Sequence, residues 1–248
     1  MAPGRPVRPG LDVSTCDACG FRAADLDRWR SPYDGHDYYD PPTGDLVRPD
    51  RPLHQFRVAQ IRRFVQGGRA ADLGCGLGET AIALAQSGFD VEGVDDSRNA
   101  IALLQREFPQ VRWHCAPLDT YLGSAGRFRL LTLYHVLEHV PQPRRICGQL
   151  RAALDPGGLL VVEVPNVGGL HARLRGWRWQ YWLDHHVNYF DVDSLSRLLA
   201  PFGFSLLHVH GKYHFNWPQG IAWRDAAHAA LAGLGFKDVV TTYWRAAG

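Results

Sequence analysis

Residues 70–78 read Ala-Ala-Asp-Leu-Gly-Cys-Gly-Leu-Gly, and they constrain the fold more than any other part of the 248-residue chain. They predict a short buried strand and a loop of three glycines, and the apolar spacing of residues 79–85 predicts a helix directly afterwards. Glycines let a backbone turn sharply and come close to a ligand, and a helix N-terminus offers free N–H groups to a polar or anionic group. The stretch therefore predicts a strand–loop–helix unit that binds a ligand at its loop.

A second predicted strand, at residues 90–94, ends at Asp95 and Asp96, about seventeen residues after Gly78. A carboxylate at this strand end can accept hydrogen bonds from both hydroxyls of a ribose. We expect Asp95 to do so, with Asp96 as the rival. Dinucleotide-binding loops follow the pattern Gly-x-Gly-x-x-Gly, whereas the third glycine here comes one position early. Glu79 stands where a pyrophosphate needs a glycine, so the spacing argues against NAD.

The loop resembles the first motif, Asp-x-Gly-x-Gly-x-Gly, of the class I S-adenosyl-L-methionine (SAM)-dependent methyltransferases. Residues 131–140, which contain Leu-Glu-His-Val, resemble the fourth-strand motif of the ubiquinone-biosynthesis O-methyltransferase group. Residues 154–166 contain a similar Pro-Gly-Gly turn, and residues 185–204 resemble the stretch before that group's sixth strand. The likeness covers roughly residues 52–210 in the same order, so it is specific for fold and cofactor but not for the substrate.

The resemblance implies an α/β fold, a Rossmann-like class I methyltransferase sheet of order 3-2-1-4-5-7-6 with strand 7 antiparallel. The alternation of strands and helices independently predicts a mainly parallel sheet covered on both faces. We expect strands near residues 69–73, 90–94, 111–115, 129–134, 158–164, 204–210 and 238–245. We expect helices near residues 53–65, 79–87, 97–107, 142–153, 192–200 and 219–232.

Residues 1–50 are rich in Pro, Gly and Asp and differ from the SAM-binding domain expected at residues 51–248. We expect this N-terminal arm to pack over the cofactor as a lid, because its aromatic residues would otherwise lie exposed; these are Trp29, Tyr33, Tyr38 and Tyr39. The arm also contains a Cys-x-x-Cys pair, Cys16 and Cys19. His36 and Asp37 could complete a zinc site, but structural zinc prefers four nitrogen or sulfur ligands, so an unmetallated remnant is favoured.

The resemblance implies cofactor contacts at the carboxyl ends of the strands. Arg57 is implied to contact the methionine carboxylate, although a solvated arginine on a basic helix is nearly as well supported. Asp72 is implied to receive the methionine amino group. Leu118 is implied to lie against the adenine, with Asp119 or backbone accepting from its amino group. The full cofactor set is Arg57, Asp72, Gly74, Cys75, Gly76, Gly78, Asp95, Asp96, Leu118, Asp119 and Tyr134, and the product is S-adenosyl-L-homocysteine.

Four of the twelve histidines are candidate catalytic residues: His135, His139, His185 and His186. If the acceptor is a hydroxyl, a histidine suits removal of its proton at neutral pH. His185 and His186 follow an aromatic segment, residues 176–182, that can form the wall of an acceptor pocket, and the sequence does not say which of the two faces it.

His135, Glu138 and His139 share one face of a helical turn if the segment is helical. In some relatives a Glu-x-x-Glu-His motif at this position binds a divalent cation. A set of two imidazoles and one carboxylate suits zinc, iron or manganese better than magnesium. The alternative, which we favour, is that Glu138 and His139 hold the loop together by hydrogen bonds. We therefore assign no metal ligand.

Composition excludes several function classes. The net charge of +2 gives no support for nucleic acid as a partner, and no apolar run reaches the eighteen residues that a membrane span needs. The five scattered cysteines fit a reducing cytoplasm, and the Pro- and Arg-rich N-terminus has no signal-peptide core. We expect a cytoplasmic monomer or homodimer that moves a methyl group to a small-molecule acceptor by in-line displacement, at oxygen in preference to nitrogen or carbon. The alternative is a SAM-binding accessory or regulatory protein without transfer activity.

Overall fold

The computed structural model describes residues 5–8, 11–17, 20–26, 37, 39, 43–212 and 237–248. Its main element is a seven-stranded sheet of order β10-β11-β8-β7-β4-β5-β6. β11 runs antiparallel to both neighbours, and the other strands run parallel to one another. The strands are β4 (Gly68–Leu73), β5 (Phe89–Asp95), β6 (Arg112–Cys115), β7 (Phe128–Tyr134), β8 (Leu154–Pro165), β10 (Phe204–Lys212) and β11 (Val239–Ala246). When the seven strands of this sheet are numbered in chain order, from β4 as strand 1 to β11 as strand 7, their order across the sheet is 3-2-1-4-5-7-6. The predicted order is therefore confirmed.

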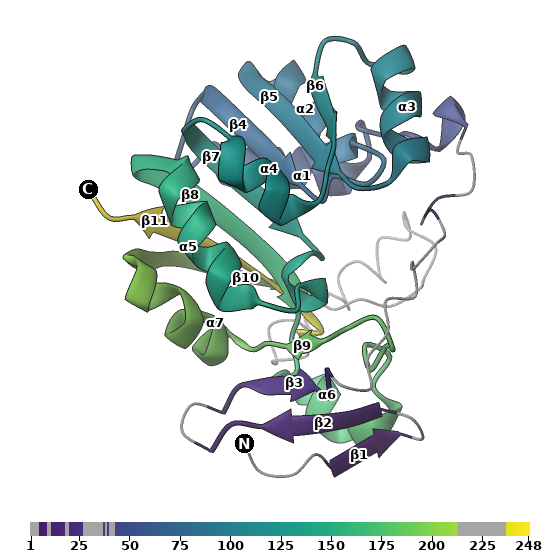
Figure 1. Ribbon diagram of the computed structural model, residues 1–248, viewed down its shortest axis with the longest axis vertical. Coiled ribbons are helices and arrows are strands. Elements are labelled where there is room, and N and C mark those ends of the chain that lie inside the picture. The colour runs from purple at the N-terminus through teal and green to yellow at the C-terminus, as the bar shows by residue number, and fades with distance from the viewer. Residues whose placement is uncertain are drawn as a thin grey trace.

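Helices cover both faces of the sheet (Figure 1). One apolar cluster joins Leu131 and Leu133 of β7 to α4 (Leu118–Ser124), α5 (Pro143–Ala153) and α7 (Val192–Leu199). A second cluster joins Leu130 to α1 (Pro52–Ile61), α2 (Glu79–Gln86) and α3 (Arg98–Glu107). Neighbouring residues of β7 thus face opposite layers, as the period of two in a strand requires. The two buried layers fix the carboxyl ends of β4, β5 and β7 at one edge of the sheet.

A second, four-stranded sheet has the order β1-β2-β3-β9, and the sequence analysis expected none of its strands. It consists of β1 (Arg5–Arg8), β2 (Leu11–Thr15), β3 (Arg22–Ala24) and β9 (Asn188–Tyr189). Its core packs Leu11, Val13 and Ala24 against the segment that contains α6 (Leu170–Arg175) and Trp179. In Figure 1 the small sheet lies at one end of the molecule, and α3 and β6 lie at the other. The N-terminal strands therefore pack on the segment that leads to His185 and His186.

Several expected boundaries differ from the structure. The helix expected near residues 53–65 ends at Ile61. Two helices, α4 and α6, were not expected, because both are short and α4 contains Thr120 and Gly123, which are poor helix formers. The remaining short helical turns are η1 (Gly44–Leu46), η2 (Leu137–His139), η3 (Gly176–Arg178) and η4 (Ala200–Phe202). The helix expected near 219–232 lies outside the described residues. Among the described helices, none has the length and apolar composition needed to cross a membrane.

Candidate active site

The glycine loop after β4 has the geometry that its sequence predicted. Gly74 and Gly76 have φ values of +68° and +56°, which side chains rarely adopt. A Cβ on Gly74 would overlap Val136, and a Cβ on Gly76 would lie 2.7 Å from the Tyr39 hydroxyl. Both positions therefore require glycine, and the loop backbone stays open to a ligand.

Asp95, at the end of β5, is joined to this loop. One carboxylate oxygen accepts a hydrogen bond from the Gly76 N–H at 2.8 Å, and the other accepts from the Ser97 N–H at 3.0 Å. Burial raises the pKa of Asp95, with smaller contributions from the charges of Asp96 and Asp37. Each carboxylate oxygen keeps a further lone pair for a ligand hydroxyl. Asp96 is exposed instead, so the geometry favours Asp95 of the two rivals.

A cavity of about 220 Å³ opens at the carboxyl ends of the strands, beside the loop. It brings together seven residues that the sequence analysis selected: Arg57, Asp72, Gly74, Cys75, Gly76, Tyr134 and His135. Tyr39, one of the aromatic residues expected in the lid, also lines it, as does Glu79, which was expected to exclude a pyrophosphate. The remaining lining residues were not selected: His54, Leu77 and Thr80. The lining therefore draws on the arm, on α1, on the start of α2 and on the ends of β4 and β7.

Arg57 lies buried at the base of this cavity, and its charge is paired. One terminal nitrogen donates to Glu163 at 2.6 Å and the other to Thr80 at 3.1 Å, while the guanidinium lies 3.7 Å from the centre of the Tyr134 ring. The Nε–H of Arg57 and the hydroxyl of Tyr134 are buried and form no hydrogen bond among the described residues. Buried donors without a partner cost free energy, so the base of the cavity favours a ligand that brings an acceptor.

Two acids, Asp72 and Glu79, add carboxyl groups to the cavity lining. Burial raises the pKa of Asp72 to about 6, although the Thr132 hydroxyl donates to its carboxylate at 2.6 Å. Burial also raises the pKa of Glu79, but hydrogen bonds from His54 and from the Arg48 N–H outweigh it, and the pKa falls below its ordinary value. Glu79 is thus ionised at the start of α2, where a phosphate group would otherwise bind, which supports the exclusion of a pyrophosphate.

His135 connects the cavity to the residues behind it. It follows β7 with a φ of +57°, which is uncommon for a residue other than glycine. Its Nδ1 lies 3.1 Å from Glu138, and its Nε2 lies 3.4 Å from Glu163. Burial lowers the pKa of His135, but these two carboxylates outweigh it and raise the pKa to about 9. His135 therefore carries a proton at neutral pH and is less suited to accept one from a substrate.

The other three candidate histidines form a cluster beyond His135. His139 lies in η2, and its ring stacks on His185 with 5.3 Å between the ring centres. His186 meets His139 and His185 edge-on, at 4.9 Å in both cases. Burial lowers the pKa of His186 to about 3, so its ring is neutral. The structure thus separates His139 from His135 and groups it with the two histidines that precede β9.

Comparison with known proteins agrees with this geometry. Residues 50–209 match the family described as "methyltransferase domain". The chain belongs to this methyltransferase family. The ubiquinone biosynthesis O-methyltransferase of Coxiella burnetii (strain RSA 493 / Nine Mile phase I) is 31% identical over 125 residues, which cover 47% of this chain and 53% of that protein. That of Bordetella avium (strain 197N) is 27% identical over 164 residues, 64% of each chain. The chain thus aligns with between half and two thirds of the length of these relatives.

Solved structures show the same fold. A SAM-dependent methyltransferase from Mesorhizobium loti has a TM-score of 0.60 at 21% identity, covering 80% of this chain and all of that one. The magnesium protoporphyrin IX methyltransferase of Synechocystis PCC 6803, solved with SAM bound, has a TM-score of 0.56 at 17% identity, covering 85% of this chain and 88% of that one. The predicted class I methyltransferase fold and its cofactor, SAM, are confirmed.

The residues of the cavity fit SAM. The glycine loop leaves backbone open to the ligand, and Asp95, which accepts from the Gly76 N–H, lies behind the loop and is not among the described residues that line the cavity. The unsatisfied Nε–H of Arg57 suits the methionine carboxylate, and the buried carboxyl of Asp72 suits its amino group. The adenine side is less complete, because the described cavity lining lacks Leu118 and Asp119, and Asp119 pairs with Arg145 at 3.3 Å instead.

Gly78 has a packing role in this structure. It begins α2 with a φ of +71°, and a Cβ there would overlap Trp113 of β6 and approach Leu104 of α3. Among the described residues it does not line the cavity. The third glycine of the motif therefore lets α2 pack closely against its neighbours, whereas Gly74 and Gly76 form the ligand side of the loop.

Besides Arg48, which donates to Glu79, two further described residues of the N-terminal arm, Asp37 and Tyr39, reach the cofactor region. The Asp37 carboxylate accepts from the Ser97 hydroxyl and, at 3.0 Å, from the Asn99 N–H, and the Asn99 side chain donates to the Tyr39 carbonyl at 2.7 Å. Asp37 is thereby held at the start of α3. Trp29, Tyr33 and Tyr38, selected as lid residues, and Cys19 and His36 of the considered zinc site lie outside the described residues. Sequence spacing gave no signal for the contact between Asp37 and α3, because the contact joins positions 60 residues apart.

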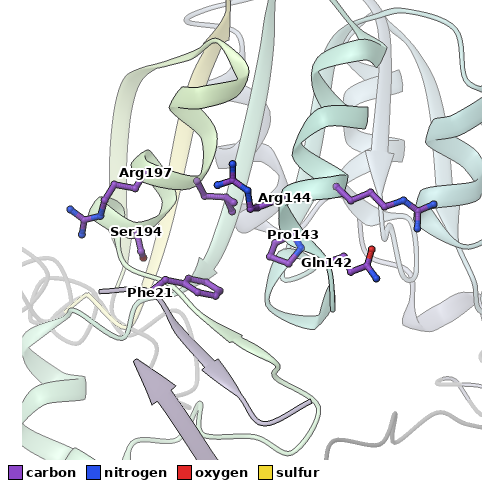
Figure 2. Close-up of a pocket in the computed structure, with 8 residues that line it drawn as sticks. Phe21, Gln142, Pro143, Arg144, Ser194 and Arg197 are labelled. Carbon is purple, nitrogen blue, oxygen red and sulfur yellow. The ribbon is translucent and has the colours of Figure 1, made fainter. Parts of the chain in front are cut away.

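A larger cavity, of about 560 Å³, lies between α5 and α7. Figure 2 shows Pro143 and Arg144 at the start of α5, Ser194 and Arg197 on α7, and Phe21 beneath them. None of the selected site residues lines it. The smaller cavity, which the motif residues line, is therefore the candidate active site.

Proposed function

We propose that this chain transfers the methyl group of SAM to a hydroxyl group of a small-molecule acceptor. The observation that carries the proposal is the cluster of His139, His185 and His186. It is linked to the cofactor cavity through the hydrogen bond between His135 and Glu138. His135 lines the cavity and bonds to Glu138, and Glu138 directly precedes His139. The names of the curated relatives, which are O-methyltransferases, support oxygen as the acceptor atom.

Bound SAM supplies an electrophilic methyl carbon and a neutral thioether as the leaving group. The protein's part is to align the acceptor oxygen, exclude water and receive the hydroxyl proton. His185 suits the last task better than His186, because His185 is half-buried whereas only 4% of His186 is exposed. Tyr181 and Trp182, which are half-buried and precede this segment, supply an apolar wall for the acceptor, whereas Trp179 is buried in the core of the small sheet.

We further propose that residues 1–50 act as the lid of the domain that begins at residue 51. The contacts of Asp37 and Tyr39 with α3 and with the glycine loop support this role, because both residues lie where they would cover the ribose side of SAM. Such a segment slows cofactor release and keeps water from the reacting atoms.

A methyl-transfer assay with labelled SAM tests the proposal, with panels of phenols, sugars and amines as acceptors. We expect label in a phenol or sugar product and none in the amines. Binding of SAM without transfer to any panel member would favour an accessory protein, and label in the amines alone would contradict O-methylation.

A further inference from the structure

Three imidazoles from two separate segments converge beside the proposed acceptor site. His139 belongs to η2, after β7, and His185 and His186 belong to the loop before β9. Each offers one ligand atom, and these atoms all lie within 4.8 Å of one another. Ring packing by itself could bring ring carbons together. Here the ring nitrogens come together.

Backbone carbonyls fix two of the three rings. His139 Nδ1 lies 2.9 Å from the carbonyl oxygen of His185, and His186 Nδ1 lies 3.0 Å from that of Tyr181. A carbonyl oxygen can only accept, so each Nδ1 carries the hydrogen and each Nε2 keeps its lone pair. Histidines that bind metals are oriented in this way, with the second ring nitrogen donating to a carbonyl or carboxylate.

The two segments that carry the cluster are tied together around it. The Val187 N–H donates to the Glu138 carbonyl at 2.8 Å, and the Asn188 side chain donates to the carbonyls of Leu137 and Val140 at 3.1 and 2.7 Å. Asn188 is itself buried. The relative position of the three rings is thus set by the fold and needs little rearrangement to bind a ligand.

We propose that His139, His185 and His186 bind one divalent transition-metal ion of the zinc type, with a fourth position open to an oxygen of the acceptor. Three nitrogen ligands and one open position are typical of catalytic zinc sites, whereas magnesium and calcium prefer oxygen ligands. Tetrahedral coordination at about 2.0–2.1 Å places ligand atoms roughly 3.4 Å apart, so the three ligand atoms, which lie within 4.8 Å of one another, would approach further when the ion binds.

This ligand set differs from the one considered from the sequence. There, His139 was grouped with His135 and Glu138, and no metal was assigned. In the structure His135 and Glu138 bond to each other, and His139 turns to the two histidines before β9. A nitrogen that binds the ion cannot also receive the acceptor's proton, so in the metal-loaded protein the ion would take over from His185 by lowering the pKa of the bound hydroxyl, whose proton would pass to solvent. This role of the ion rests on the proposed function, whereas binding of the ion does not.

The test is Zn²⁺ binding to the untagged, full-length protein, measured by calorimetry and by metal analysis after dialysis. We expect one ion per chain, and we expect His185→Ala and His186→Ala each to weaken binding about 100-fold or more. His208→Ala is the matched control, because His208 packs against Phe64 and Tyr243 on β10 and should leave Zn²⁺ binding unchanged. Visible absorption of the Co²⁺-loaded protein should show four-coordinate geometry that both cluster variants lose. Circular dichroism shows whether each variant is folded.

His135→Ala separates the two ligand sets, and we expect it to retain Zn²⁺ binding. Loss of binding in His135→Ala with retention in His185→Ala and His186→Ala would overturn the proposal. Absence of stoichiometric binding in the folded wild-type protein would also overturn it. These measurements need neither SAM nor acceptor, so a protein that binds no Zn²⁺ would leave the methyl-transfer proposal standing. A protein that binds one ion but transfers no methyl group would contradict only the proposed function.

Discussion

The cofactor loop and the histidine cluster lie at the same edge of the sheet, but the chain builds them differently. The loop takes its main residues from one contiguous stretch, Asp72 to Gly78, between a strand and the helix that follows it. The cluster joins His139 to His185 and His186 across 46 residues, through a short turn and a loop. β3 of the four-stranded sheet pairs with β9, which follows directly after the cluster. The comparison shows that the glycine loop is a local feature of the chain, whereas the histidine cluster depends on long-range contacts.

The sharpest test of this division is His185→Ala. We expect turnover to fall about 10²–10⁴-fold, the range for loss of a proton-transfer group, with the dissociation constant for SAM unchanged. Steady-state kinetics and calorimetry measure the two quantities, and His208→Ala serves as the control. A parallel loss of SAM affinity would show that the two regions are not separable.

Asp95→Ala tests the cofactor region in the same way. Hydrogen bonds to a charged group contribute about 1.5–3 kcal/mol each, so removal of the ribose acceptor should weaken SAM binding by at least tenfold. Asp96→Ala is the matched control, since Asp96 is the exposed neighbour. If the two substitutions changed the calorimetric dissociation constant for SAM equally, Asp95 would not be the residue that binds the ribose.

Asp37→Ala tests whether the arm belongs to the cofactor region. The substitution removes hydrogen bonds to Ser97 and Asn99, each contributing about 0.5–1.5 kcal/mol, and should speed SAM release severalfold. Stopped-flow displacement of SAM measures the rate. Asp45→Ala, at an exposed acid in the same arm, is the control. An unchanged release rate in Asp37→Ala would argue against a lid.

The smallest effect concerns His135, which connects the two regions. Its pKa is raised to about 9 in the folded protein, above the ordinary value of 6.5, so the protonated form stabilises the fold. This contribution is fully present below pH 6.5 and is lost as pH rises through 9. Thermal unfolding of His135→Gln should therefore depend less on pH between 6.5 and 9 than that of the wild type. Identical slopes would show that His135 is not charged in the fold.

The sequence predicted the sheet and the glycine loop because those features follow from contiguous patterns. Strand and helix periods, the glycine spacing and the acid at the end of β5 are each local. His54 could have been found in the same way, because it lies three residues before Arg57 and shares its helix face. The bounds of α1 and the short α4 were missed, because propensity is weak over few residues.

The histidine cluster could not be predicted from the same reasoning. Helical spacing grouped His135 with His139, but His135 has a positive φ and η2 spans only Leu137–His139, so that spacing does not apply. The true neighbours of His139 are fixed by hydrogen bonds from Val187 and Asn188, which are distant in the sequence. The small sheet was missed for a related reason: β9 is two residues long, and only its pairing with β3 defines it.

The place of β11 in the sheet has a consequence for the order in which the protein folds. β10 pairs with β11 and not with β8, so no strand of the main sheet is available to β10 until residues 239–246 are in position. Pairing of β11 with β8 joins residues more than 70 positions apart, and such long-range pairing is slow to form. We therefore expect the five-stranded part from β8 to β6 to gain protection from hydrogen exchange first, and β10 with β11 to gain it together in a later, slower phase.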